Sequence, residues 1–266
     1  MNAPLPANPS TERIVSSTEH EFDVRGLSHR GLVRVHNEDA WHADSSLGLA
    51  IVADGVGGHA NGALASQAVV RWISSYVRRV MVFSTRAALS EKMQQERTLG
   101  RAIAYANKRL VSINATAGDV KDRCGTTIVG IWAPCGTASA ATVFHVGDSR
   151  MYLLRKNARL EALTRDHSAY QQWVDTGRRG SPPPKSYILQ ALGLSDVAPD
   201  IISIKVAAGD RFLLCTDGLS NGVEPAEMQE VMTKSASLET ACERFISLGL
   251  ARGGNDNLTS VVGVFS

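Results

Sequence analysis

The sequence lacks the cysteine patterns of a zinc-finger or disulfide-rich protein. Its 266 residues include only four cysteines, and these show neither a CxxC spacing nor a Cys/His cluster. Three stand in or beside predicted strands and the fourth in a predicted helix: Cys124, Cys135, Cys215 and Cys242. We therefore expect reduced thiols in a cytoplasmic protein, and no zinc site.

Long apolar runs and basic blocks are also missing. No stretch approaches the ~20 apolar residues of a membrane helix, and no signal-peptide pattern is present, so we expect no membrane association. The formal charge of +2 is small, and Lys and Arg form no block, so nothing indicates a nucleic-acid partner. A hydrophobic content of 44% with 20% charged residues fits a globular protein with a sizeable core.

The chain length suits one large domain or two small ones, and the lack of an internal repeat or linker favours one. Residues 1–20 carry little that could pack, so we expect a disordered tail before a single domain at 21–266. Within it, residues 167–192 lose periodicity and contain a Gly, Arg and Pro cluster, which is the composition of an exposed flap.

Apolar periodicity divides the domain into strands and helices. Alternating or continuous apolar runs predict strands at 22–27, 47–53, 126–132, 138–146, 150–154, 201–206, 211–216 and 258–265. Helical spacing predicts helices from near residue 62 and at 99–114, 169–176, 224–233 and 238–250. Short connections predict antiparallel hairpins among the three strands between 126 and 154. The pattern is typical of the α+β class, with packed antiparallel sheets and helices outside them.

Four aspartates stand in well-separated acidic turns: Asp54, Asp148, Asp217 and Asp256. Each is predicted where a strand ends, and such ends can converge in space though far apart in sequence. Converging carboxylates would repel one another and resist ionisation, whereas a hard cation such as Mg²⁺ or Mn²⁺ would remove that repulsion. Taken alone, each could instead be a turn aspartate bonded to local amides. Together they indicate a metal-assisted enzyme.

The segments around these aspartates resemble the motifs of one enzyme family. Residues 31–39 (Gly-Leu-Val-Arg-Val-His-Asn-Glu-Asp) and 53–59 (Ala-Asp-Gly-Val-Gly-Gly-His) are similar to the first two motifs of the PPM family, the type-2C metal-dependent Ser/Thr protein phosphatases. Five more follow in family order, at 124–127, 145–150, 163–168, 215–218 and 256–259. One Asp-Gly pair is weak evidence, but seven ordered motifs over about residues 22–265 identify the chain as a bacterial-type member.

The resemblance implies a four-layer αββα fold, in which two mostly antiparallel sheets are flanked by pairs of helices. It also implies a centre of two Mn²⁺ or Mg²⁺ ions, with a third, weaker ion. By resemblance Asp54 would bridge the two ions, the Gly55 carbonyl would bind one of them, and Asp217 and Asp256 would complete the other. Asp148 would help hold the third ion.

Three further residues complete the implied site. Glu38 and Asp39 lie close to the ions, either as ligands or through water, with a supporting role favoured for Asp39. Arg34 resembles the residue that grips the substrate phosphate, for which its planar fork is suited; the alternative is a surface salt bridge. For Asp148 the alternative is an ion pair with Arg150.

The implied chemistry needs no covalent intermediate. A metal-activated water or hydroxide would attack phosphorus directly, without a phosphoenzyme, while Arg34 offsets charge on the phosphate oxygens. The catalytic set is then Arg34, Asp54, Asp217 and Asp256.

Three departures from the family pattern concern the proton donor, a local ion pair and the flap. Val56 stands where animal members carry a histidine, so a general acid at that position is absent. Gly62-Ala63 replaces the Gly-Glu of many bacterial members. Residues 184–187 (Pro-Lys-Ser-Tyr) replace a His-Pro-Arg-Asn-like stretch found in bacterial members. Substrate specificity is therefore the family property that transfers least readily to this chain.

The sequence thus predicts a cytoplasmic, monomeric protein phosphatase acting on phosphoserine and phosphothreonine in proteins, including a cognate Ser/Thr kinase. One alternative is an enzyme dedicated to one regulatory phosphoprotein, such as a sigma-factor pathway component or a secretion-system regulator. Another is a pseudophosphatase that binds phosphoproteins without turnover, but such a protein would not need to keep all four aspartates.

Overall fold

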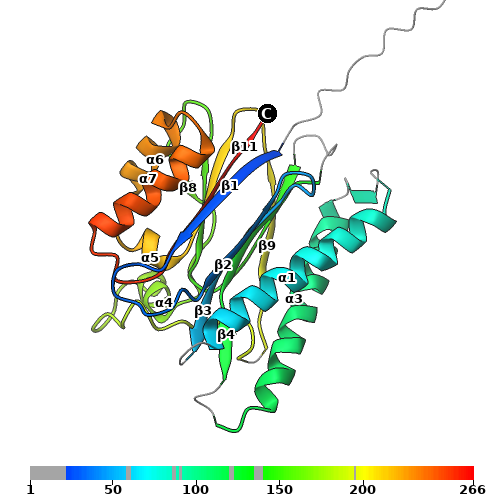
Figure 1. The fold of residues 1–266 in the computed structure, drawn as a ribbon, viewed down its shortest axis with the longest axis vertical. Coiled ribbons are helices and arrows are strands. Elements are labelled where there is room, and N and C mark those ends of the chain that lie inside the picture. Colours follow the sequence, from blue (N-terminus) through cyan, green and yellow to red (C-terminus); the bar gives the residue numbers. More distant parts are fainter. Residues whose placement is uncertain are drawn as a thin grey trace, which may run out of the picture.

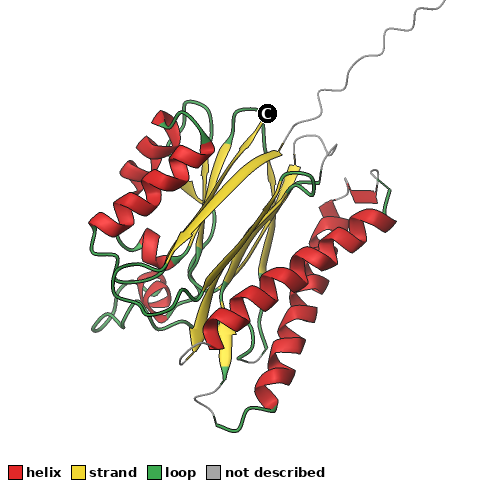
Figure 2. Cartoon of the chain, viewed as in Figure 1, coloured by secondary structure: helices red, strands yellow, loops and turns green. Residues whose placement is uncertain are grey.

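Two β-sheets packed face to face form the centre of the computed structural model (Figure 1). It describes residues 22–57, 61–85, 88–89, 92–119, 123–134, 140–194 and 196–266. The predicted tail, together with His59 and Cys135, lies outside these ranges. In Figure 2 the strands occupy the middle of the molecule and the helices its two outer sides.

Every strand pairing in the two sheets is antiparallel. The first sheet has the order β1 (Phe22–His29), β11 (Leu258–Phe265), β10 (Arg211–Cys215), β7 (Arg150–Leu154) and β8 (Glu161–Ala162). The second has the order β2 (Asp39–Asp44), β3 (Leu49–Gly57), β5 (Ile128–Trp132), β6 (Ala140–Val146) and β9 (Asp200–Lys205), and β4 (Cys124–Thr126) pairs with the end of β3.

The helices cover the outer faces of both sheets. The second sheet is covered by α1 (Asn61–Phe83) and α3 (Lys92–Ala115), and the first by α5 (Asp217–Ser220), α6 (Pro225–Lys234) and α7 (Leu238–Ala251). A short helix, α4 (Ala169–Asp175), lies between β8 and β9 in the chain. The expected α+β sandwich is confirmed. Within the described part of the chain, no helix combines the length and the apolar character that a bilayer crossing requires.

The strand β3 shows why its sequence reads as one continuous apolar run. Leu49 and Ile51 face the core beneath α1 and α3, while Ala50 and Val52 face the core between the sheets. All four are fully buried. Burial of each large apolar side chain contributes about 1.5–3 kcal/mol, so this strand is a rigid platform for the residues that follow it.

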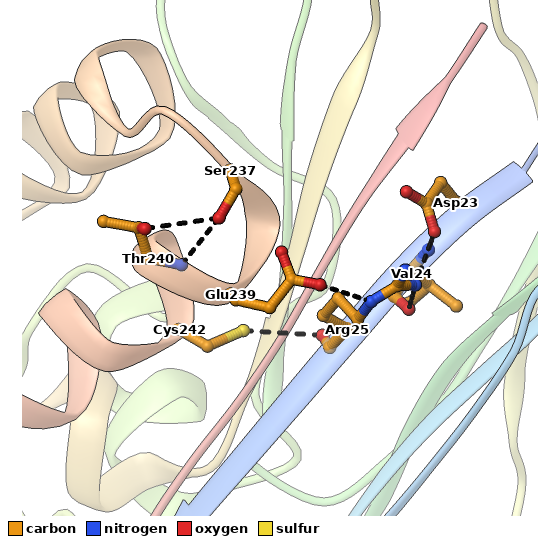
Figure 3. A network of polar contacts seen from close by, with 7 residues as sticks. All are labelled: Asp23, Val24, Arg25, Ser237, Glu239, Thr240 and Cys242. Atoms are coloured by element: carbon orange, nitrogen blue, oxygen red, sulfur yellow. Dashed lines mark hydrogen bonds and ion pairs between the residues drawn. The ribbon is translucent and has the colours of Figure 1, made fainter.

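A small polar network links the helix α7 to β1 (Figure 3). The Arg25 Nε atom donates to Glu239 Oε1 at 2.6 Å, and the Cys242 thiol lies 3.5 Å from the Arg25 carbonyl oxygen. Ser237 caps the helix by accepting from the Thr240 amide at 3.1 Å. Because the Arg25–Glu239 pair is exposed, it adds little energy, and burial of Phe245 against the sheet holds the helix in place.

One predicted connection is wrong. We expected a hairpin between β6 and β7, but β6 pairs within the second sheet and β7 within the first. The turn between them therefore crosses from sheet to sheet. Gly147 makes this possible with a φ of +112°, and a Cβ there would lie 2.5 Å from the Thr127 side chain.

Candidate active site and metal centre

A cleft of about 230 Å³ is lined by residues of β3 and by residues that flank strands of both sheets. Seven of the eight predicted site residues line it: Arg34, Glu38, Asp54, Gly55, Asp148, Asp217 and Asp256. The eighth, Asp39, is buried beside it. A larger cavity of about 710 Å³ lies between α1 and α3, and no carboxylate is among its described lining residues.

Asp54 lies within β3 and not at a strand end, contrary to the sequence prediction. Asp54 nevertheless lies where the pairing partner of β3 changes. The strand β3 pairs with β5 up to Val52 and with β4 from Gly55 onward. Thr127 stands between those two partners: its hydroxyl accepts from the Asp54 amide at 3.1 Å, and its amide donates to the Asp54 carbonyl at 2.9 Å. The backbone amide and carbonyl of Asp54 are thus both hydrogen-bonded, and the residue lines the cleft.

Close backbone packing explains the two glycines near Asp54. A Cβ on Gly55 would lie 2.3 Å from the Gly62 carbonyl oxygen, and the Gly55 amide donates to the Glu38 carbonyl at 3.1 Å. A Cβ on Gly62 would lie 2.5 Å from Glu38 Oε2. The Glu38 carboxylate therefore rests against the start of α1, where a side chain in place of Gly62 would displace it.

Asp217 and Asp256 reach the cleft from different positions. Asp217 follows β10, as predicted, and is the first residue of α5. Asp256 lies before β11 and so does not follow a strand, contrary to the prediction. Its Oδ1 accepts from the Asn257 amide at 2.8 Å, and its Oδ2 lies 2.7 Å from an Arg34 nitrogen. Arg34 thus forms the predicted alternative, a salt bridge, but with a carboxylate of the cleft itself.

Asp148 lies in the crossing turn after β6 and is 5% exposed. Burial, with the nearby charge of Asp217, raises the pKa of Asp148 to about 7. Its Oδ1 atom is buried with no hydrogen-bond partner among the described residues. The alternative pairing with Arg150 does not form, because Arg150 makes two bonds to Asp166, at 2.8 and 2.7 Å.

Asp39 is held by two threonines. Its Oδ2 accepts from the Thr216 hydroxyl at 2.9 Å and from the Thr259 hydroxyl at 2.6 Å. Burial raises the pKa of Asp39 to about 7, and its Oδ1 lacks a partner among the described residues. Because Asp39 and Asp54 are opposite each other in β2 and β3, this placement favours a supporting role for Asp39.

The carboxylates in the cleft fit divalent metal ions by their chemistry. Burial and the charge of Asp39 raise the pKa of Asp54 well above its usual range, and burial and Asp256 raise the pKa of Asp217. Buried, mutually repelling oxygen donors with unsatisfied atoms are what Mg²⁺ or Mn²⁺ would stabilise. Asp54, Asp217 and Asp256 could hold such ions, with the Gly55 carbonyl beside them.

Asn257 is a site residue to which the sequence assigned no role. Its side-chain nitrogen donates to the carbonyls of Arg30 and His36, at 2.8 and 2.9 Å, and its oxygen accepts from the Glu38 amide at 2.8 Å. It thereby fixes both ends of the loop that carries Arg34. The available signal was its place directly after Asp256 in the last motif.

The predicted flap folds back on itself beside the cleft. The Leu189 amide donates to the His167 carbonyl at 2.7 Å, and the Ala169 amide to the Tyr187 carbonyl at 2.9 Å. These bonds bring Ser186 and Ile188 to the lining of the cleft. Its role in selecting substrates remains a prediction.

Comparison with known proteins gives one family for nearly all of the chain. Residues 25–256 match the family described as Protein phosphatase 2C. The serine/threonine phosphatase Stp of Listeria welshimeri is 34% identical over 239 residues, which cover 86% of this chain and 90% of that protein.

Solved structures agree. The structure described as PppA, a key regulatory component of T6SS in Pseudomonas aeruginosa, superimposes with a TM-score of 0.79 at 31% identity, covering 92% of this chain and 98% of that one. The catalytic domain of the serine/threonine protein phosphatase PstP, in complex with two manganese ions, gives 0.77 at 32% identity and covers 92% and 99%.

Proposed function

The chain belongs to the protein phosphatase 2C family and is a serine/threonine protein phosphatase, and we propose that it hydrolyses phosphoserine and phosphothreonine in proteins at the acidic cleft. The observation that carries the assignment of the site is the convergence of Asp54, Asp217 and Asp256 on one cleft. No other cavity described for the chain brings three predicted ligands together.

The residues of the cleft divide into ligands and supports. Asp54, Asp217, Asp256 and the Gly55 carbonyl would hold two ions, and Asp148 would serve a third, weaker ion. When bound, the ions would supply Lewis-acid charge that lowers the pKa of an attacking water and offsets charge on the phosphate. Mn²⁺ is supported by the manganese-bound PstP structure, and Mg²⁺ fits the same oxygen donors.

Arg34 would position the substrate. Its guanidinium group is half exposed at the rim of the cleft and is paired with Asp256. A phosphate there would receive two parallel N–H bonds from the planar fork, which would hold it beside the proposed metal ligands. Hydrolysis would then proceed by direct displacement at phosphorus, without a phosphoenzyme.

The departing alkoxide needs a proton, and the described lining of the cleft contains no histidine. Val56 occupies the position at which a general acid would stand in animal relatives. We propose that solvent water supplies this proton. The proposal is consistent with a cleft that is open to solvent beside Ser186.

One comparison favours an enzyme with a single phosphoprotein substrate over one with many. The similarity to PppA, described as a key regulatory component of T6SS, supports an enzyme dedicated to one regulatory phosphoprotein and opposing one Ser/Thr kinase. We propose that it acts as a monomer in the cytoplasm, where the three described cysteines, which are free thiols, would stay reduced. A phosphoproteome comparison with and without the gene would identify the substrate: many changed sites would contradict the single-substrate role.

The activity itself is tested by hydrolysis of p-nitrophenyl phosphate and of a phosphothreonine peptide, with Mn²⁺ and with chelator. We expect turnover of both substrates with Mn²⁺ and none with chelator. Folded protein that binds the peptide without metal-dependent turnover would instead indicate a pseudophosphatase.

A further inference from the structure

Two histidines and an aspartate meet outside the acidic cleft. One ring nitrogen from each of His145 and His167 and one carboxylate oxygen of Asp200 all lie within 4.8 Å of one another. None of the three lines the acidic cleft. Among the described residues this is the one group of His, Cys, Asp or Glu side chains with such a spacing of single donor atoms.

Strand register brings two of the three together. His145 at the end of β6 is directly opposite Asp200 at the start of β9. Residues opposite each other in an antiparallel pair point to the same face of the sheet. That face is the inner one, because Val143 and Ile204, two and four residues along these strands, pack into the core between the sheets. His145 and Asp200 therefore close the end of that core.

His167 completes the group from the chain that follows β8. The Gly147 amide donates to His167 Nδ1 at 3.2 Å, and the His167 amide donates to the Gly147 carbonyl at 2.7 Å. Since Nδ1 accepts a bond, the proton of the neutral ring is on Nε2, which lies 3.2 Å from Asp200 Oδ2. The His167 ring is thus held at Nδ1 by the Gly147 amide, and its Nε2 atom faces the Asp200 carboxylate.

His145 supplies the observation that points to a ligand. It is 1% exposed, and neither ring nitrogen has a hydrogen-bond partner among the described residues. Its ring centroid lies 4.7 Å from that of His167. Burial and the neighbouring His167 lower the pKa of His145 to about 3, so the ring is neutral, which is the form that binds metal ions.

We propose that His145, His167 and Asp200 form a second metal site, for a borderline-soft divalent cation such as Zn²⁺. Two imidazoles and a carboxylate give three protein ligands and leave one position open, and imidazole donors favour Zn²⁺ over Mg²⁺. Such a site would differ from the sequence expectation of no zinc site, which rested on the lack of a CxxC spacing and of a Cys/His cluster. It shares no residue with the acidic cleft and does not depend on the proposed phosphatase mechanism.

Cation binding has a defined proton balance. To bind the cation through Nε2 as a neutral ring, His167 would move its proton from Nε2 to Nδ1, and Nδ1 would then give up its bond from the Gly147 amide. That bond belongs to the turn that carries Asp148. An ion bound to His145, His167 and Asp200 would therefore change how the turn is held, without contacting the acidic cleft.

The first test is calorimetric titration of the intact protein with Zn²⁺ in excess Mg²⁺, which occupies the oxygen-rich cleft. We expect one equivalent of Zn²⁺ to bind to the two neutral rings without release of a ring proton, seen as a heat that does not depend on the ionisation enthalpy of the buffer. Asp200→Asn should weaken this binding by about ten-fold or more. The side chain of Asp200 is 57% exposed, so the variant should fold. Asp196→Asn, an exposed aspartate nearby, should bind Zn²⁺ like the wild type.

The second test locates the ion. Crystals soaked in Zn²⁺ with excess Mg²⁺ should show an anomalous peak about 2.0–2.1 Å from one nitrogen of each histidine. His167→Gln should remove the peak and leave peaks in the acidic cleft unchanged. Zinc found only in the acidic cleft, or an Asp200→Asn isotherm that superimposes on that of the wild type, would overturn the proposal.

Discussion

The acidic cleft and the imidazole group, defined as His145, His167 and Asp200, lie only three residues apart along the chain at their nearest point, between His145 and Asp148. They differ in the donor atoms that they offer. The cleft gathers oxygen donors from both sheets and their loops, whereas the imidazole group offers two ring nitrogens at the end of the inter-sheet core. The crossing turn with Gly147 separates the two groups.

This difference shows how one fold can distinguish cations. Crowded carboxylates, with pKa values raised by burial and mutual repulsion, require positive charge and suit hard ions. Two neutral imidazoles with one half-exposed carboxylate carry less negative charge and suit softer ions. Loss of one group should therefore leave the other group's affinity for its ion intact.

The largest effect is expected from Asp54→Asn. The change removes charge from the residue expected to bridge the two ions, so activity with Mn²⁺ should fall by about 10³-fold or more, the loss of roughly 4 kcal/mol of transition-state stabilisation. Steady-state hydrolysis of p-nitrophenyl phosphate measures this.

The same variant sharpens the comparison between the two groups. Without metal it should melt at a higher temperature than the wild type, because it lacks one of several repelling carboxylates, and its binding of Zn²⁺ at the imidazole group should be unchanged. Asp196→Asn, which alters an exposed aspartate, is the matched control. Near-normal activity of Asp54→Asn would remove Asp54 from the centre.

Arg34→Ala should have the next largest effect. If the guanidinium binds phosphate in the ground state, KM should rise by about ten-fold or more, with a smaller change in kcat. Arg34→Lys keeps the charge but loses the two-pronged geometry and should recover only part of the loss. Initial-rate kinetics on a phosphothreonine peptide separate these effects, and an unchanged KM in Arg34→Ala would place the residue outside the substrate site.

Much of the cleft could be predicted from the sequence because its residues stand in short local motifs. Asp54 and Asp217 each precede a glycine, and seven of the eight predicted residues reach one cavity. Apolar patterns likewise predicted most strands. A strand buried on one face alternates apolar and polar residues, and a strand buried on both faces is continuously apolar.

The features that the sequence did not predict depend on how strands pair, which local sequence patterns do not specify. The turn at Gly147 resembles a hairpin in sequence but crosses between sheets. The strand β2 was not predicted, because its polar residues, among them His42, give no apolar alternation. The imidazole group was also missed, because His145 and Asp200 meet only through the register of β6 and β9.

Asp148→Asn should affect metal activation more than substrate binding. The variant keeps the shape of the side chain but loses the charge proposed to hold the third ion. The Mn²⁺ concentration for half-maximal activity should rise by about ten-fold, with KM for peptide little changed. A Mn²⁺ activation curve that superimposes on that of the wild type would contradict the third-ion assignment.

The last prediction concerns Asp39→Asn, whose effect is measured as stability against pH in chelator. The pKa of Asp39 in the folded protein is raised to about 7 from 3.8, so the wild type loses stability as pH rises between about 4 and 7. The variant lacks that loss. Its free energy of unfolding relative to the wild type should therefore increase by at most about 1.4 kcal/mol per pH unit across this window and level off above it.

Urea denaturation at a series of pH values measures the difference between Asp39→Asn and the wild type. The lowered pKa of His145 acts in the opposite direction, with stability lost as pH falls through about 6.5, but both proteins contain it and it cancels. Asn can still accept bonds from Thr216 and Thr259, so the comparison isolates the charge. A difference that stays constant with pH would mean that Asp39 is not strained by burial, and that the repulsion in the acidic cleft is carried by Asp54 and Asp217.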